Sequence, residues 1–95
     1  LPNLDKCILI DYGHHLVKFQ NDCLYYTDLS IKKDISEALQ NLYEKLRYCE
    51  KIHNGKYILI YDVGKIKQEN IECLYDKIYR ASSGKIIYIP LHPFR

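Results

Sequence analysis

The stretch from Leu46 to Arg95, LRYCEKIHNGKYILIYDVGKIKQENIECLYDKIYRASSGKIIYIPLHPFR, decides the fold because it contains two strand-like apolar runs. Lys56–Val63 (KYILIYDV) has apolar or aromatic residues on both alternating faces, which is typical of a strand covered by a helix and by a second layer. Lys85–Ile89 (KIIYI) repeats the pattern before Pro90, a residue that ends main-chain pairing or lies at a sheet edge. We therefore expect a central strand followed by an edge strand.

A helix is expected before this stretch. Asp34, followed three residues later by Glu37, resembles a capping box, in which the first side chain accepts from free helix amides and the second reaches back. Apolar residues then repeat at steps of four and three, giving one stripe that must pack against another element. They are Ile35, Leu39, Leu42, Leu46 and Cys49. Asn54-Gly55 is expected to end the helix, because both residues tolerate the left-handed conformation.

The segment between the two strands favours a second helix. In Asn70–Arg80, the residues Ile71, Leu74, Tyr75 and Ile78 fall at i, i+3, i+4 and i+7, which is one helical face.

The amino-terminal third is expected to contain strands and turns. Cys7–Asp11 (CILID) is a short apolar run before Tyr12-Gly13, typical of a strand followed by a turn. His15–Phe19 and Cys23–Tyr26 can each continue as a strand, with Asn21-Asp22 as a turn between them. The pairing of these strands does not follow from the sequence.

Length and composition limit the protein to one domain without a strong electrostatic signature. A chain of 95 residues buries roughly 60–65% of its unfolded surface and supports one core. The net charge of +2 is spread along the chain, so no nucleic-acid tail is visible. No apolar run approaches the ~20 residues that cross a bilayer, so we expect a soluble, intracellular protein without membrane contact.

The four cysteines are expected to be reduced core residues. Cys7, Cys23, Cys49 and Cys73 form no C-x-x-C pair and no Cys/His pair at zinc-finger spacing, so we expect no metal. Each lies in an apolar run, where a thiol behaves as a small buried hydrophobe, and this usage favours a reducing compartment.

Two patterns could suggest catalysis, and both have simpler explanations. His14-His15 near Asp11 resembles an acid–base group, but no nucleophile is identifiable beside it and a turn explains the pair. Asp11, Asp28 and Asp62 each follow a strand-like run, and such acids would bind magnesium in a hydrolase if at least two of them converged. Aspartate at a strand end more often makes local hydrogen bonds. We therefore expect no catalytic residue and no cofactor.

Tyrosines interleaved with lysines could form a stacking platform for single-stranded nucleic acid. They are Tyr25, Tyr26, Tyr57, Tyr61, Tyr75, Tyr79 and Tyr88. Tyrosine also suits protein interfaces, and we expect these residues to divide mainly between the core and a protein interface.

The order of helix, Gly turn, strand, connection and strand over residues 29–95 resembles the amino-terminal tip domain of the RNA polymerase I stalk subunit. The motifs that carry the resemblance are Leu46-Arg47-Tyr48, Tyr61-Asp62, Lys65–Lys67 and Ile89–Phe94. That subunit belongs with the seventh subunit of RNA polymerase II and with the corresponding stalk subunit of the archaeal polymerase. The resemblance implies an α+β domain over residues 1–95, with a small antiparallel sheet packed on one main helix. To this we add a second short helix at about residues 68–80, where the family has an irregular connection or strand. The family has an OB-type barrel after this domain, and we expect no such barrel within these 95 residues.

The resemblance implies a non-catalytic subunit that docks on the polymerase core and supports initiation at ribosomal RNA genes. The expected docking residues come from two loops; they are Asp62, Gly64, Lys65, Ile66, Lys67 and Gln68, and Ser82, Ser83, Gly84 and Lys85. The expected partners are large and small polymerase subunits, a stalk partner subunit and an initiation factor, in the nucleus and its nucleolus. The alternatives are the same subunit of RNA polymerase II or III, or a free-standing module that binds single-stranded nucleic acid. A small hydrolase that uses the strand-end acids is a third class.

Overall fold

The computed structural model describes residues 3–52, 57–81 and 87–89. Four strands form one sheet in the order β2-β1-β3-β4, and every neighbouring pair is parallel. The strands are β1 (Cys7–Asp11), β2 (Tyr25–Asp28), β3 (Tyr57–Tyr61) and β4 (Ile87–Ile89). Two helices, α1 (Ile35–Glu50) and α2 (Ile71–Ala81), connect β2 to β3 and β3 to β4.

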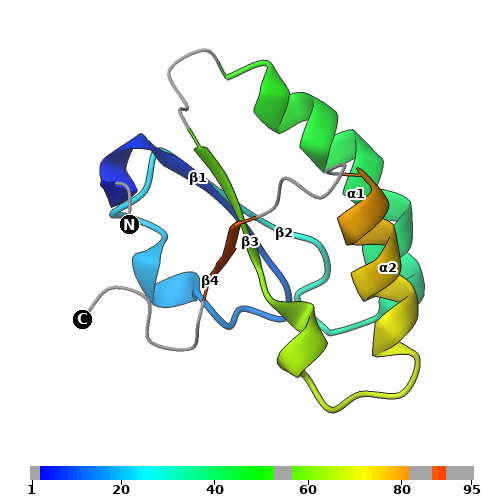
Figure 1. Cartoon of the computed structure of the whole chain (residues 1–95). Helices are drawn as coiled ribbons and strands as arrows, with labels where there is room; N and C mark the ends of the chain where they lie inside the picture. Colours follow the sequence, from blue (N-terminus) through cyan, green and yellow to red (C-terminus); the bar gives the residue numbers. More distant parts are fainter. Residues whose placement is uncertain (1–2, 53–56, 82–86, 90–95) are drawn as a thin grey trace.

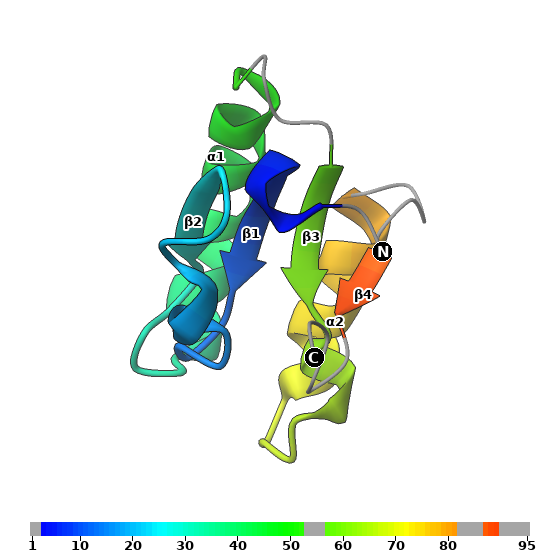
Figure 2. The ribbon, with the colours of Figure 1, turned by 90° about the vertical axis from the view of Figure 1, so that its left-hand side faces the viewer.

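Both helices cover the same face of the sheet (Figure 1). The connection from β1 to β2 has only a short 3₁₀ helix, η2 (Val17–Phe19), and lies on the opposite face (Figures 1 and 2). β2 is added on one side of β1, and the chain then crosses back to add β3 and β4 on the other side of β1. Because crossovers between parallel strands share one hand, this reversal places the connections on opposite faces. It also creates a topological switch point between β1 and β3.

The predicted combination of a small sheet, one main helix and a second short helix is confirmed, but the antiparallel arrangement is wrong. The physical reason lies in the apolar runs. All five residues of β1 are buried, since the strand is covered on both faces. Continuous apolar strands joined by helices are typical of parallel sheets, whereas antiparallel hairpins need short turns.

The amino-terminal strands are also partly corrected. Cys7–Asp11 is a strand as predicted, but His15–Phe19 is not, because its residues belong to a loop and to η2. The strand predicted at Cys23–Tyr26 begins two residues later, at Tyr25. The central strand at β3 and the sheet edge at β4 are confirmed within the described residues. Asn54-Gly55 and Pro90 lie outside them.

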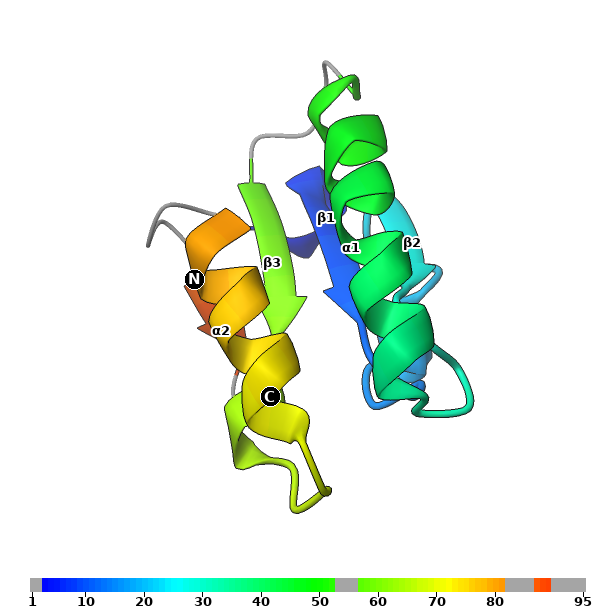
Figure 3. The same ribbon diagram turned by 90° about the vertical axis from the view of Figure 1, so that its right-hand side faces the viewer.

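The main helix begins as predicted. The Asp34 carboxylate accepts a hydrogen bond from the Glu37 amide at 3.1 Å, while the Glu37 side chain pairs with Lys32 at 3.7 Å. Leu42 and Cys49, in the apolar stripe, are buried against the sheet. Figure 3 shows α1 and α2 side by side in front of the strands, and the two helices contact each other. The two helices therefore form one layer on this face of the sheet.

Candidate functional site

The carboxyl ends of all four strands lie at one edge of the sheet because the strands are parallel (Figures 2 and 3). Loops following β1, β2 and β3 therefore meet there. Open parallel sheets usually bind ligands at this edge, beside the switch point. Asp11, Asp28 and Asp62 all lie in this region, and their surroundings decide what the edge can do.

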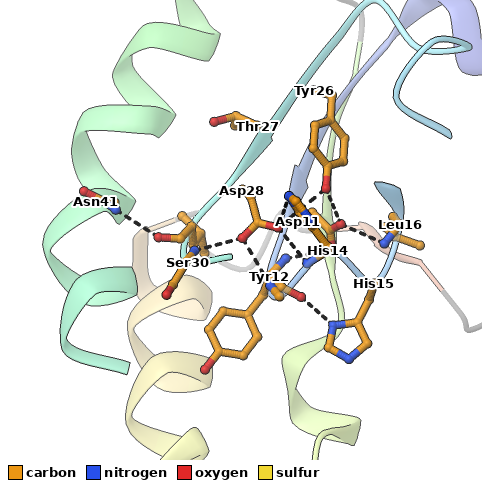
Figure 4. A network of polar contacts seen from close by, with 12 residues as sticks. Asp11, Tyr12, His14, His15, Leu16, Tyr26, Thr27, Asp28, Ser30 and Asn41 are labelled. Atoms are coloured by element: carbon orange, nitrogen blue, oxygen red, sulfur yellow. Dashed lines mark hydrogen bonds and ion pairs between the residues drawn. The ribbon is translucent and has the colours of Figure 1, made fainter. Parts of the chain in front are cut away.

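Asp11 is completely buried at the end of β1. Its Oδ1 accepts from the Tyr12 amide at 2.7 Å, and its Oδ2 accepts from the Leu16 amide at 2.7 Å and the Tyr26 hydroxyl at 2.6 Å (Figure 4). Burial raises the pKa of the Asp11 carboxyl, and the hydrogen bonds from Tyr26, Leu16 and Tyr12 partly offset that effect. Both carboxylate oxygens are thus used to fix the loop after β1.

Asp28 holds the same loop from the neighbouring strand. Its Oδ1 accepts from the Gly13 amide at 3.1 Å and the Ser30 amide at 2.9 Å. Its Oδ2 accepts from the His14 amide at 2.7 Å (Figure 4). Gly13 and His14 have φ angles of 64° and 59°, and consecutive amides in such turns form concavities that bind anions. Here the carboxylate of the chain itself occupies the concavity.

Asp11 and Asp28 therefore converge, which the sequence pattern alone did not establish. The Tyr26 hydroxyl lies 2.6 Å from Asp11 Oδ2 and 3.5 Å from Asp28 Oδ2. The His14 Nε2 atom is 3.9 Å from Asp28 Oδ2. Main-chain amides from both loops bind these carboxylates. The bonds from Tyr12 and Ser30 are the local kind expected of strand-end aspartates, whereas those from Gly13 and His14 to Asp28 join neighbouring loops.

The switch point between β1 and β3 is closed by side chains. The His15 ring stacks on Tyr61, with centroids 4.6 Å apart and planes at 13°, and its Nδ1 contacts the Tyr12 carbonyl. The Tyr12 hydroxyl donates to Gln68 Oε1 at 2.7 Å. Gln68 Nε2 in turn donates to the Lys33 carbonyl at 2.7 Å. These contacts connect the loops that follow β1, β2 and β3 into one rigid edge.

The loop after β3, predicted as the docking loop, lies at this edge. It includes a 3₁₀ turn, η3 (Val63–Lys65), which Asp62 caps by accepting from the Gly64 amide at 3.0 Å. Val63 is buried and anchors the turn. Of the predicted residues, Gly64, Lys65 and Lys67 are exposed, whereas Asp62, Ile66 and Gln68 are partly buried. Ser82, Ser83, Gly84 and Lys85 lie outside the described residues.

The cysteine prediction holds for two residues and fails for one. Cys7 and Cys49 are buried, and Cys23 is partly buried, but Cys73 is exposed on α2. Burial raises the pKa of the Cys49 thiol to about 11, so this group is protonated at neutral pH and is a poor nucleophile. Cys73 lies on the outer face of α2, whereas Leu74 and Ile78 are buried. The helical period of this segment is sufficient to predict that Cys73 is exposed.

The tyrosines divide between interior and surface. Tyr26 and Tyr61 point into the polar network and the switch point, while Tyr57 and Tyr79 are 45% and 52% exposed. Tyr88 belongs to β4, whose side chains are not described. The position of Tyr26, which donates its hydroxyl to Asp11 and lies 3.5 Å from Asp28, was missed because it depends on the pairing of β1 with β2.

Comparisons with protein-family models, curated proteins and solved structures found no match. Within residues 3–52, 57–81 and 87–89, no group of three or more His, Cys, Asp or Glu residues could hold a metal ion. In the same part of the chain, no helix has the length and apolar character to cross a membrane.

Proposed function

We propose that this domain is a non-catalytic docking module, which contacts a protein partner through the loops at the carboxyl edge of its sheet. The observation that supports the proposal is that side chains of this chain fill the positions at the carboxyl ends of the strands where a small ligand would otherwise bind. Asp11 and Asp28 are bound by main-chain amides, and the His15–Tyr61 stack closes the switch point. Loops on a rigid sheet remain available for recognition.

The exposed part of this edge forms what we name the carboxyl-edge surface. It consists of Ile31, Lys32, Lys33, Gly64, Lys65 and Lys67. Ile31 is 63% exposed, so it offers an apolar anchor among four lysines. The Gln68–Lys33 hydrogen bond holds its two loops together. Because this bond ties the main chain of one loop to the other loop, the loops themselves need little further ordering on binding.

The stalk subunit of RNA polymerase I is the more specific form of the proposal. It rests on the sequence resemblance alone, since the parallel sheet differs from the small antiparallel sheet that the resemblance implies. The two forms make different predictions about the partner. The stalk form requires large polymerase subunits, whereas the docking module requires only a protein that contacts the carboxyl-edge surface.

The test is affinity purification of the full-length protein from its own cells, followed by mass spectrometry. Lys65→Glu reverses one charge on the carboxyl-edge surface, and Lys6→Glu reverses one at the opposite edge of the sheet. We expect a stoichiometric protein partner that Lys65→Glu loses and Lys6→Glu retains. Large polymerase subunits among the proteins lost would support the stalk form. Equal recovery with both variants would contradict the docking proposal.

A further inference from the structure

A second surface lies at the free side of β2. Among the described residues, β2 pairs only with β1, so it is an edge strand. The Leu29 amide donates to the Asp11 carbonyl at 2.9 Å, in register with the Asp11–Asp28 pair, so the main-chain groups of Leu29 face β1. Because main-chain groups alternate sides along a strand in a parallel pair, those of Tyr25 and Thr27 also face β1, whereas those of Tyr26 and Asp28 face away. The groups that face away form a row that another strand could pair with.

A groove runs beside this row, between β2 and α1. Tyr25 and Thr27 form its strand side, and its helix side is formed by Glu44, Lys45, Arg47, Tyr48 and Lys51. The Lys45 Nζ donates to Thr27 Oγ1 at 2.8 Å, and the rings of Tyr25 and Tyr48 lie 5.3 Å apart. The side chains of Arg47 and Lys51 are exposed. The strand residues whose side chains form the groove wall thus alternate with the residues whose main-chain groups face away from β1.

The groove carries a positive charge. It has three basic side chains, Lys45, Arg47 and Lys51, against one acidic side chain, Glu44. Within the described part of the chain, Lys45 bonds to a neutral hydroxyl, and neither Arg47 nor Lys51 takes part in an ion pair. A ligand that brings carboxylates into the groove would therefore find cations that are not already neutralised.

We propose that this groove binds an extended acidic segment of a partner protein, which adds to the sheet as a further strand beside β2. The four residues of β2 span about 13 Å, enough to pair with a short strand. Side chains of an added strand alternate between the two faces, so acidic residues at every second position would face α1. The groove thereby specifies alternating Asp or Glu in its ligand.

Single-stranded nucleic acid also binds cationic grooves with aromatic rings, but this groove suits it less well. The rings of Tyr25 and Tyr48 are tilted by 48° to each other, so they do not form one flat platform for successive bases. The outward main-chain groups of β2 match another peptide main chain, which a nucleic acid lacks. The peptide is therefore the occupant to test.

The experiment measures fluorescence anisotropy of a labelled eight-residue peptide of alternating Glu and Val, titrated with the protein. An analogue N-methylated at every interior amide keeps the charges and removes the main-chain donors. We expect N-methylation to weaken binding to the wild-type protein by about tenfold or more, which is about 1.4 kcal/mol or more. Equal binding of the two peptides would overturn strand addition, and this comparison needs no protein variant.

Protein variants test whether the basic side chains of the groove contribute to peptide binding. We expect Arg47→Glu with Lys51→Glu to weaken peptide binding by about tenfold or more. Lys77→Glu with Arg80→Glu, which also reverses two charges at exposed positions but on α2, should leave binding unchanged. A uridine octanucleotide that displaces the peptide more effectively than unlabelled peptide would overturn the proposal in favour of nucleic acid. Unchanged peptide binding by a folded double variant would also overturn it.

Discussion

Tyr26→Phe removes one oxygen atom from the buried polar network and leaves the ring in place. The Tyr26 hydroxyl donates to Asp11 Oδ2 at 2.6 Å, and burial raises the pKa of Tyr26, so the hydroxyl stays protonated. A hydrogen bond to a charged group contributes about 1.5–3 kcal/mol, and we expect the free energy of unfolding to fall by that amount. In a domain of this size the unfolding midpoint should fall by roughly 6–24 °C.

The effect of Tyr26→Phe should depend on pH through Asp11. Burial raises the pKa of Asp11 in the folded state, and the Tyr26 hydroxyl lowers it by stabilising the carboxylate. Without the hydroxyl, the folded-state pKa of Asp11 rises further. The full destabilisation should therefore be measured above the folded-state pKa that Asp11 has in Tyr26→Phe. It should shrink as the pH falls below that pKa, because a protonated Asp11 accepts only a neutral hydrogen bond.

The assay is urea and thermal unfolding, followed by circular dichroism, from neutral pH down through the folded-state pKa of Asp11. Tyr43→Phe is the matched control, because Tyr43 is 45% exposed on α1 and its ring, which faces Lys77, is kept. We expect the control to change the free energy of unfolding by less than about 0.5 kcal/mol. If Tyr26→Phe behaves like Tyr43→Phe, the buried contact between Tyr26 and Asp11 does not exist and the reasoning is refuted.

Asp28→Asn replaces one carboxylate oxygen, which accepts hydrogen bonds from main-chain amides, by an NH₂ group that cannot accept them. Thermal unfolding should show that the free energy of unfolding falls by about 1–3 kcal/mol. Asp22→Asn, at an exposed position, should change it by almost nothing. Asp34→Ala removes the cap of α1 and should lower the free energy of unfolding by about 1 kcal/mol in urea titrations; no loss would contradict the cap. Cys73 should react with a thiol reagent well before Cys49, which mass spectrometry of the labelled protein can check, and the reverse order would contradict the orientation of α2.

The sequence predicted the elements better than their arrangement. The 3.6-residue period correctly predicted both helices, including α2, where the family resemblance favoured an irregular connection or strand. The cap at Asp34 followed from one side chain and a nearby amide, so a short pattern was sufficient. Such local signals depend on neighbouring residues and not on the rest of the fold.

Strand direction could not be obtained in the same way. Cys7–Asp11 and Tyr57–Tyr61 pair directly in register, yet about 50 positions separate them in the chain. Their continuous apolar character was a signal for a parallel sheet, and it was outweighed by the resemblance to an antiparallel domain. The meeting of Asp11 with Asp28 depends on this pairing, since β1 and β2 must lie side by side with their ends aligned. The polar network was therefore beyond the reach of sequence patterns.

The polar break after the central strand predicted the exposure of part of the loop after β3, whereas the docking role of this loop stays a prediction. Gly64, Lys65 and Lys67 follow an apolar strand and contain no core residue, so their exposure was expected and is observed. The contribution of Ile31 to the same edge was missed, because it lies in the loop after β2 and reaches the edge only in a parallel sheet.

The most direct test of a docking role at the carboxyl edge is site-specific photo-crosslinking in the cells of origin. A benzophenone amino acid would replace Lys65 in one variant and Lys6, at the opposite edge of the sheet, in the other. The docking account predicts a defined protein cross-link from position 65 and none from position 6. A cross-link from position 6 alone would contradict it, because the partner would then contact the amino edge of the sheet.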